Sequence, residues 1–280
     1  MGKPAKIMAE KKDTSNGVYF YGVCSSVKTK KLSAKDSGAG IGGGPVFFIP
    51  YQDVEAVVSE VSLEEFGSEE IQSRAVEDWK WIKDQALTHE RVIETVMNSC
   101  GLIIPMKFGT IFKDRKSLTG SLKKDYLKLK NLLASLIGKE ERSVKIYSKR
   151  QLLADEIKKK SPLIQSKLAE MRSLPAGRQY FLEEEVNDLI KKEVSNSINN
   201  NYIPLFLAKL KGIAEEAREN KILGEELTQR KDPMVFNGAF LVTKEQADRF
   251  RGEIEKLQAE YEPIGFTFES SGPWPPYNFV

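Results

Sequence analysis

The first part of the chain alternates short apolar runs with turn-forming residues, a pattern typical of strands. Residues 18–24 form an uninterrupted apolar and aromatic run that is too short for a helix, which predicts a buried strand. After a polar, glycine-rich loop, residues 46–49 predict a second strand closed by Pro50, and residues 54–61 predict a third. Because the connection between these two strands is short, we expect them to be antiparallel neighbours.

Two segments further along have apolar residues three or four positions apart, the spacing of an amphipathic helix. The inner faces predicted for them are Val76, Trp79, Ile82, Ala86, Ile93 and Val96 within residues 74–98, and Leu122, Tyr126, Leu129, Leu133 and Leu136 in the second helix. Gly101 and Gly138 stand where left-handed helix stops are expected. Between the helices, residues 102–104 predict a short strand and residues 105–112 an ordered turn or an edge segment.

The second half of the chain also combines strands with helices. Residues 143–147 alternate as in a strand, and a long helical region follows from about residue 151 to residue 220. We expect breaks near residues 175–177 and before Pro204, because proline cannot continue a helix interior.

The last part of the chain predicts another strand, a helix and a final strand. Residues 235–242 predict the first of these strands, and residues 243–246 have the form of a capping box that opens a helix. The inner face of that helix is expected to be Ala247, Phe250, Ile254 and Leu257. Residues 264–268 alternate apolar and polar positions, which predicts a strand with one buried face.

This order of elements predicts an α+β protein with two domains. The N-terminal domain is expected to be a small mixed sheet with helices, and the C-terminal domain a modified ferredoxin-like sandwich with an extended C-terminal tail. The predicted segments are a disordered lead-in at residues 1–16, the N-terminal domain at 17–138, the C-terminal domain at 139–271, and a proline- and aromatic-rich tail at 272–280.

Composition and charge exclude several classes of protein. The chain has 43 Lys and Arg against 40 Asp and Glu, a net charge of +3, and 40% hydrophobic residues, which excludes a disordered polyelectrolyte and argues against a nucleic-acid binder. The lead-in lacks the apolar core of a signal peptide, and no run approaches the roughly 18 apolar residues of a spanning helix. We therefore expect a cytoplasmic protein with no membrane or nucleic-acid partner.

Candidate catalytic and metal-binding residues are few. His89, the single histidine, falls on the apolar stripe between Ala86 and Ile93, so we expect a buried, structural residue bonded to the backbone rather than a catalytic base. Cys24 and Cys100 form no C-x-x-C pair, which favours two small buried hydrophobic residues over a metal site or a redox pair. We expect no catalytic, cofactor-binding or metal-binding residues.

One glycine-rich segment matches the dinucleotide-binding pattern G-x-G-x-x-G, at residues 38–43. In a true dinucleotide site a helix follows the glycines, whereas here the strand predicted at residues 46–49 follows. The pattern therefore favours a flexible connector.

Two segments break the local rules for a plain strand or loop. In residues 105–112, a proline and a glycine mark an edge or a bulge, yet the segment has more apolar side chains than one small strand needs. A core element and an edge that binds a partner both remain open for it. In the tail, three prolines stiffen a strip that carries Trp274, Tyr277 and Phe279, which can dock onto its own chain or onto a partner.

These two segments, with His89-Glu-Arg-Val-Ile-Glu94 upstream of them, resemble the GvpL/GvpF family of gas vesicle proteins. The block Pro105-Met-Lys-Phe-Gly-Thr110 and the ending Gly272-Pro-Trp-Pro-Pro-Tyr-Asn-Phe279 follow that family's order, from about residue 17 to the C-terminus. The family-motif or partner-binding residues are therefore predicted to be Pro105, Met106, Lys107, Phe108, Gly109, Thr110, Phe112, Gly272, Pro273, Trp274, Pro275, Pro276, Tyr277 and Phe279.

The resemblance implies a minor gas vesicle component or an assembly factor located at the gas vesicle. Such a protein acts with the very hydrophobic shell protein and with other accessory gas vesicle proteins during nucleation and assembly. The family has no catalytic residues, so none are carried over to this chain, and no cofactor is expected.

A function of a different class remains open beside this one. A small-molecule-binding enzyme or sensor would use the ferredoxin-like domain and would need a concave pocket with convergent polar groups. His89 in such a pocket beside an acidic residue would favour the enzyme, whereas His89 in a packed core would favour the assembly role.

Overall fold

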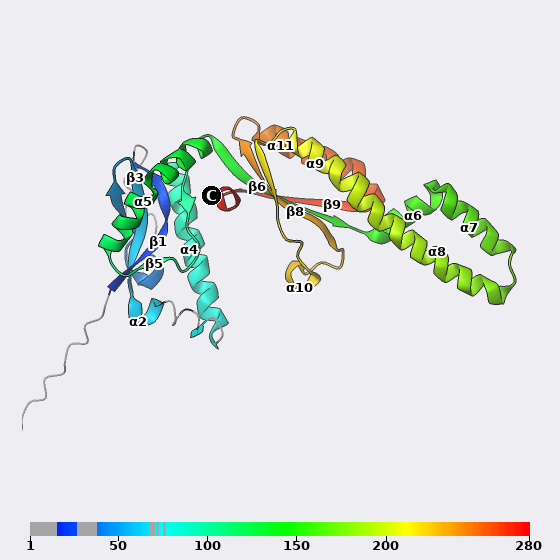
Figure 1. Cartoon of the computed structure of the whole chain (residues 1–280), viewed down its shortest axis with the longest axis horizontal. Coiled ribbons are helices and arrows are strands. Elements are labelled where there is room, and N and C mark those ends of the chain that lie inside the picture. Colours follow the sequence, from blue (N-terminus) through cyan, green and yellow to red (C-terminus); the bar gives the residue numbers. More distant parts are fainter. Residues whose placement is uncertain (1–15, 27–37, 68–70, 72, 75–76) are drawn as a thin grey trace, which may run out of the picture. The chain divides into compact units, whose positions relative to one another are not determined.

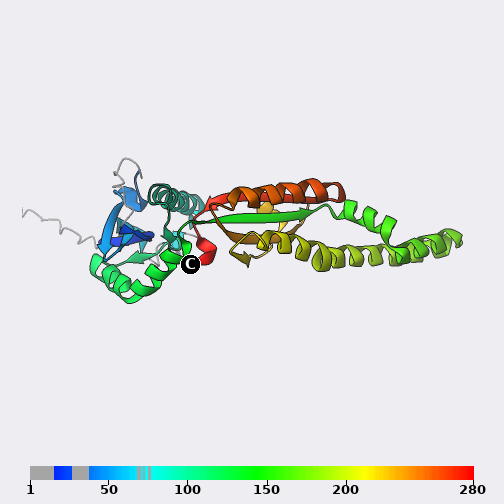
Figure 2. The same ribbon diagram turned by 90° about the horizontal axis from the view of Figure 1, so that it is seen from above.

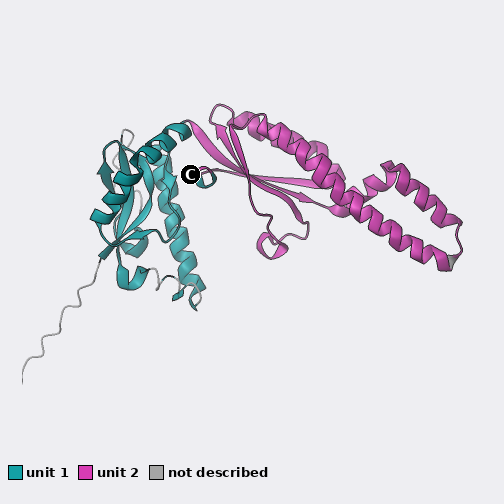
Figure 3. Cartoon of the chain, viewed as in Figure 1, with its two compact units in different colours: residues 1–137, 275–278, 280 teal, residues 138–274, 279 magenta. Residues whose placement is uncertain are grey.

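The computed structural model describes residues 16–26, 38–67, 71, 73–74 and 77–280, and the chain divides into two compact units (Figure 3). Unit 1 consists of residues 1–137, 275–278 and 280, and unit 2 of residues 138–274 and 279. The predicted lead-in lies outside the described residues apart from Asn16, where the first strand begins. Within the described part of the chain, we find no helix with both the length and the hydrophobicity that crossing a membrane requires.

Unit 1 is built on one antiparallel sheet with strand order β2-β3-β1-β4, to which β5 adds by pairing with β1 (Figure 1). Its strands are β1 (Asn16–Ser25), β2 (Phe47–Tyr51), β3 (Val54–Ser62), β4 (Ile104–Pro105) and β5 (Ile111–Phe112). The three predicted N-terminal strands and their antiparallel pairing are confirmed. Strand β1 is buried along almost its whole length, which explains its uninterrupted apolar run.

The prediction that Pro50 closes the second strand is wrong. Strand β2 continues through Pro50, which lies opposite Glu55, to Tyr51. Because β2 lies at the edge of the sheet, the missing N–H of proline can be tolerated there.

Two long helices cover the two faces of this sheet. Helix α4 (Trp79–Cys100) packs against Tyr19 and Tyr21, whereas α5 (Arg115–Leu136) packs against Phe20. Successive side chains of a strand point to opposite faces, so β1 contributes to both cores. Shorter helical segments of this unit are α2 (Leu63–Phe66) and the 3₁₀ turn η2 (Ile41–Gly43).

Helix α4 begins later than the sequence predicts. Asp78 caps it by accepting a hydrogen bond from the Trp81 N–H at 3.0 Å. Trp79, which was predicted to face inward, is 72% exposed, because the buried residues of α4 lie in its C-terminal half. Gly101 ends the helix in the left-handed conformation, as predicted, and Val76 lies outside the described residues.

A closed ring of hydrogen bonds fastens the turn before β2 to the sheet. The Ile41 N–H donates to the Tyr21 hydroxyl (2.6 Å), which donates to Ser59 Oγ (2.9 Å), and Ser59 Oγ donates to the Ile41 carbonyl (3.0 Å). A Cβ atom on Gly40 would lie 2.7 Å from the Tyr21 hydroxyl. Glycine at this position therefore allows the turn to pack against the sheet.

Unit 2 has a second antiparallel sheet, with strand order β7-β8-β6-β9. Its strands are β6 (Lys139–Ser148), β7 (Glu216–Glu219), β8 (Met234–Thr243) and β9 (Phe266–Trp274). Helices α9 (Ile203–Lys211) and α11 (Ala247–Tyr261) run along one face of it (Figures 1 and 2). The strands predicted at 143–147 and 235–242 are confirmed. The last strand begins two residues later than predicted, after the 3₁₀ turn η4 (Glu262–Ile264).

The helical region between β6 and β7 is divided differently from the prediction. It comprises α6 (Arg150–Lys160), α7 (Pro162–Ser173), α8 (Ala176–Ser197), the π-helical η3 (Ile198–Tyr202) and α9. The break near residue 175 is confirmed, but none precedes Pro204, because the π turn lets α8 continue into α9. The helix predicted up to residue 220 ends at Lys211, since β7 follows and pairs with β8.

Helix α11 begins without the predicted capping box. Thr243 is the last residue of β8, and its carbonyl accepts the Gln246 N–H at 3.0 Å, so a backbone turn leads into the helix at Ala247. A short helix, α10 (Glu225–Thr228), precedes β8. Three of the predicted inner residues of α11 are buried: Phe250, Ile254 and Leu257.

Candidate functional site

A buried chain of hydrogen bonds through His89 holds the 105–112 segment against the sheet of unit 1. The Gly109 N–H donates to the Tyr19 hydroxyl (3.0 Å), and that hydroxyl donates to His89 Nδ1 (2.9 Å). On the other side of the ring, Nε2 donates to the Met106 carbonyl (3.2 Å). Because a carbonyl can only accept, Nε2 carries a proton, and in the neutral ring Nδ1 accepts the proton of the Tyr19 hydroxyl.

Burial sets the charge of the groups in this chain of hydrogen bonds. His89 is 1% exposed and Tyr19 is fully buried. Loss of solvation lowers the pKa of His89 to about 4, because an apolar surrounding disfavours the imidazolium, and the bond to Met106 opposes this shift only in part. Burial also raises the pKa of Tyr19. Both side chains are therefore neutral near pH 7 and act as positioning groups.

The turn between β4 and β5 is fixed by its own hydrogen bonds as well. Gly109 has φ of +80°, a left-handed conformation that other residues rarely adopt. Thr110 Oγ1 donates to the Lys107 carbonyl (2.7 Å), and the Thr110 carbonyl accepts the Phe20 N–H (2.9 Å). Strands β4 and β5 therefore pair with β1 at two separate places on either side of the turn.

The tail contributes Tyr277 to unit 1. Its hydroxyl donates to Glu90 Oε2 on α4 at 2.8 Å, and its ring packs against the core on the α4 side of the sheet. Burial raises the pKa of Glu90 and also that of Tyr277, whose hydrogen bond to the carboxylate adds to the shift. Pro275 and Pro276 beside it are buried. This part of the tail is thus docked on its own chain.

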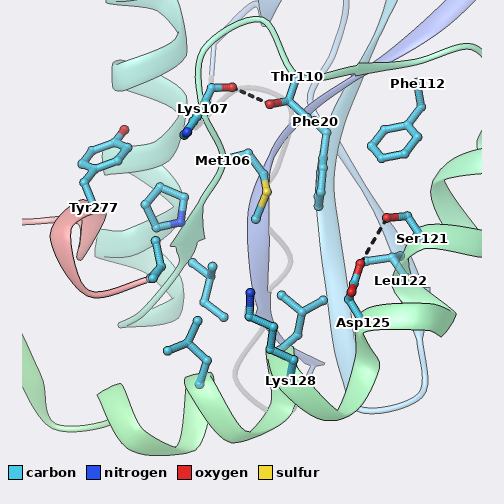
Figure 4. A pocket seen from close by; sticks show the side chains of 15 residues that line it. Phe20, Met106, Lys107, Thr110, Phe112, Ser121, Leu122, Asp125, Lys128 and Tyr277 are labelled. Atoms are coloured by element: carbon cyan, nitrogen blue, oxygen red, sulfur yellow. Dashed lines mark hydrogen bonds between the residues drawn. The ribbon is translucent and has the colours of Figure 1, made fainter.

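An open apolar pocket of about 450 Å³ lies between the 105–112 segment and helix α5 (Figure 4). Met106 stands in its middle, and the Phe112 ring lies further along the same wall. The opposite wall is α5, which contributes Ser121, Leu122, Asp125, Lys128, Leu129 and Leu132.

The structure brings only part of the predicted motif residues together at this pocket. Those that line it are Pro105, Met106, Lys107, Thr110, Phe112 and Tyr277. Phe108 turns to the other face of the sheet, where its ring packs 5.8 Å from that of His89. Four other motif residues belong to unit 2 and do not line the pocket: Gly272, Pro273, Trp274 and Phe279.

Sequence analysis missed the wall of the pocket that α5 supplies. Asp125, Lys128 and Leu132 line it, whereas Leu122 and Leu129 were predicted only as core residues. A signal was present, because these positions recur three or four residues apart beside the predicted apolar stripe.

The two cysteines are buried in the core between β1 and α4, as predicted for small hydrophobic residues. The structure brings Cys24 and Cys100 into one core although they are far apart in the sequence, and the Cys24 thiol donates to the Glu55 carbonyl at 3.8 Å. The neighbouring Cys100 thiol, and after it burial, raises the pKa of the Cys24 thiol. No group of three His, Cys, Asp or Glu side chains that could hold a metal ion occurs in the part of the chain that the structure describes.

The stability of unit 1 is expected to fall as the pH is lowered from about 6.5 to about 4. Unfolded His89 takes up a proton near its ordinary pKa of 6.5, whereas in the folded unit it stays neutral until about pH 4. Between these values the unfolded state binds more protons, so the free energy of unfolding falls by up to about 3 kcal/mol.

Urea unfolding near neutral pH and near the folded pKa of about 4 measures this effect. The His89→Gln variant should lack this part of the pH dependence, which separates it from the titration of carboxylates. An equal loss of stability in both proteins would contradict the role of His89.

Comparison with known proteins identifies the family. The family described as gas vesicle synthesis protein GvpL/GvpF matches residues 17–280. This chain belongs to the GvpL/GvpF family. Gas vesicle protein F1 of Halobacterium salinarum is 24% identical over 267 residues, which cover 95% of this chain and 93% of the relative. Gas vesicle protein F of Microcystis aeruginosa is 29% identical over 179 residues, covering 62% of this chain and 68% of that protein.

Solved structures share the fold of this family member. The crystal structure of GvpF from Anabaena sp. PCC7120 has a TM-score of 0.66 at 19% identity, covering 95% of this chain and 96% of that one. GvpF from Microcystis aeruginosa has a TM-score of 0.64 at 21% identity, covering 94% and 98%. The likeness shows an α+β fold with two antiparallel sheets and helices. Membership of the family supports an accessory role in gas vesicles.

Proposed function

We propose that this protein binds the hydrophobic shell protein of the gas vesicle and helps it to nucleate and assemble, together with other accessory gas vesicle proteins. Before a wall closes, its subunits expose apolar faces and unpaired strand edges, and such surfaces aggregate. An assembly factor therefore has to cover apolar surface reversibly while it stays dissolved itself. We place this action in the cytoplasm, at the growing vesicle.

The apolar pocket of unit 1 is the observation that carries this proposal. Both segments through which the sequence resembles the family, the 105–112 block and the tail, contribute to its lining. Met106 and Phe112 offer partly exposed apolar side chains, and the hydrogen bonds of His89 hold the backbone beneath them. A surface that is already rigid loses less conformational entropy on binding. We propose Met106, Phe112 and Tyr277 as contact residues.

The other motif residues are proposed to support this surface rather than to form it. Phe108 and Gly109 anchor the turn, and Pro275 and Pro276 are buried beside Tyr277. His89 lies in a packed core and does not line the pocket, so the observation on which the enzyme or sensor hypothesis depends does not favour that hypothesis.

The replacement Met106→Glu is expected to reduce recovery of the shell protein in a pull-down roughly tenfold or more, because binding would bury an unpaired carboxylate. Leu127→Glu is the matched control. It adds the same charge to α5 at a side chain that is 70% exposed and does not line the pocket, so recovery should be unchanged.

Thermal unfolding of both variants establishes that each remains folded. Equal recovery by the two folded variants would remove the pocket from binding, and no recovery by the unaltered protein would refute the proposed function. Point variants serve better than a chain ending at Ser271, which would also lose the last residues of β9.

We also propose the finer description of the fold. The chain order of strands and helices in unit 2, with the sheet order β7-β8-β6-β9, supports a modified ferredoxin-like sandwich. The proposed domains remain residues 17–138 and 139–271, with the tail at 272–280. The division of the compact units after Ile137 supports the first boundary, whereas unit 2 continues to Trp274.

A further inference from the structure

We infer that the outer edge of β2 in unit 1 binds an extended apolar segment of a partner protein, which adds to the sheet as one more strand. This inference deepens the proposed function and rests on it for the identity of the partner, whose unpaired strand edges it assigns to a surface of this chain. Two observations lead to it: the direction of the main-chain groups of β2, and the side chains along this edge.

The hairpin of β2 and β3 determines which main-chain groups face outward. Tyr51 and Val54 pair on either side of a two-residue loop, so they exchange hydrogen bonds with each other. Such pairs alternate along an antiparallel ladder with pairs that exchange none. Phe48 and Pro50 belong to the second kind. Their main-chain groups therefore point away from β3, toward the open edge of the sheet.

The outward main-chain groups of β2 offer hydrogen bonds to a further strand. Phe48 presents both its N–H and its carbonyl, and Pro50 presents its carbonyl. Among the described residues, none of these three groups has a hydrogen-bond partner. The missing N–H of Pro50 takes nothing from the ladder with β3, because at this position it would also point outward. Unpaired main-chain groups of this kind are bound by an extended chain rather than by a helix.

The side chains of β2 favour an apolar partner. Phe47, Phe48, Ile49 and Tyr51 are all partly exposed. Phe48 packs on the α4 side of the sheet, and the other three pack on the α5 side. An added strand places its own side chains beside these on both faces. Apolar residues in that strand would remove from water the surface that β2 leaves partly uncovered.

The charged side chains near this edge do not select a charged partner. Arg115 lies 2.7 Å from a carboxylate oxygen of Glu60, and Lys130 lies 2.9 Å from one of Asp53. Both cations are therefore neutralised within unit 1. Glu55 lies on β3, one strand away from the edge.

The other edge strands of the two sheets are less suited to a partner strand. Strands β4 and β5 have two residues each. In unit 2, β7 carries charge at Glu216, Arg218 and Glu219, and β9 carries Glu269, which pairs with Arg230. Charged side chains and short length are the usual protection of an edge against strand addition. The five residues of β2 include no charged side chain.

Two synthetic peptides test this inference. One is an extended, valine-rich peptide with a lysine at each end, and the other is the same peptide N-methylated at two successive residues. The methyl groups remove a donor from each edge of the peptide and leave its side chains unchanged. Fluorescence anisotropy with the full chain should show that the unmodified peptide binds roughly tenfold more tightly. Equal binding would overturn the inference, because side chains alone would then account for it.

Amide hydrogen exchange locates the bound peptide. In the free protein the Phe48 amide should exchange faster than that of Ile49, which occupies a hydrogen-bonded position opposite Ala56. The unmodified peptide should slow the exchange of Phe48 roughly tenfold and that of Ile49 much less. Protection of other amides without protection of Phe48 would overturn the inference.

The replacement Phe48→Pro should weaken binding of the unmodified peptide roughly tenfold, because it removes the outward N–H without removing a bond to β3. Phe48→Val is the matched control, since it also loses the ring but keeps the N–H, and its affinity should stay within about threefold of the unaltered protein. Thermal unfolding establishes that both variants remain folded. Equal affinity of the two folded variants would overturn the inference. If Phe48→Pro does not fold, the N-methylated peptide decides the question.

A second copy of this chain is the alternative occupant of the edge. Analytical ultracentrifugation of the unaltered protein and of Phe48→Pro should give the same mass. A dimer that the replacement dissociates would overturn the inference, because β2 would then pair with itself.

The shell protein itself separates this inference from the proposed function. If Phe48→Pro and Phe48→Val recover it equally in a pull-down, the inference fails while the proposed function stands. If the unaltered protein does not recover it at all, although it discriminates the two peptides, the proposed function fails while the strand-binding edge stands.

Discussion

Replacing His89 with alanine is expected to lower the free energy of unfolding of unit 1 by about 3–5 kcal/mol. The imidazole is 1% exposed and is hydrogen-bonded on both sides, to the Tyr19 hydroxyl and the Met106 carbonyl. Without it, the buried hydroxyl has no acceptor for its proton, and the packed core acquires a cavity. Urea unfolding at neutral pH, with hydrogen exchange resolved by unit, measures the loss.

Two further variants identify the cause of that loss. Leu87→Ala shortens a side chain of the same helix that is 58% exposed, so it should change the stability by no more than about 0.5 kcal/mol. His89→Gln keeps polar atoms in the cavity and should be less destabilising than alanine. A loss below about 1 kcal/mol for alanine would mean that the hydrogen bonds of His89 contribute little to the fold.

A second large effect is expected in unit 2, where Phe206→Ala should cost about 3–5 kcal/mol. Phe206 is fully buried, and its ring centroid lies 4.8 Å from that of Tyr261, 5.2 Å from Phe266 and 5.1 Å from Phe268. Removing the ring deprives three aromatic neighbours of their common contact. Hydrogen exchange of the backbone amides of unit 2 measures the change in its free energy of unfolding.

The matched control for this variant is Phe181→Ala on α8. The same atoms are removed there from a side chain that is 73% exposed, so the stability should change by no more than about 0.5 kcal/mol. Similar losses for Phe206 and Phe181 would show that burial in this core does not determine the effect.

The strands and helices that sequence analysis predicted correctly are those whose burial follows from local periodicity. Strand β1 has its uninterrupted apolar run at residues 18–24 because both of its faces are covered there, and the inner face of α5 recurs at helical spacing because one face of that helix is buried. The predictions were wrong where pairing with a strand distant in the sequence, rather than the local residue pattern, determined the structure. Pro50 is accepted inside β2 because the strand lies at an edge, and Glu216–Glu219 becomes a strand because β8 offers it a pairing partner.

At the candidate site too, the sequence predicted which segments matter but not how their side chains are arranged. Their pattern was enough to single out residues 105–112 and the tail, but not to tell that Phe108 would point to one face of the sheet and Met106 to the other. Lys128 could not be assigned to the pocket from its position in the chain, because only the packing of α5 against the sheet brings it opposite Met106.

The amino-acid sequence by itself determined the family, the α+β class and the antiparallel neighbours, since these depend on motifs and on periods of two or three to four residues. Tertiary structure alone decided the neutral state of His89, the shared core of the two cysteines and the apolar pocket between the 105–112 segment and α5. The physical reason is that burial, hydrogen bonding and the lining of a pocket depend on which distant residues become neighbours, and this is decided when the cores pack.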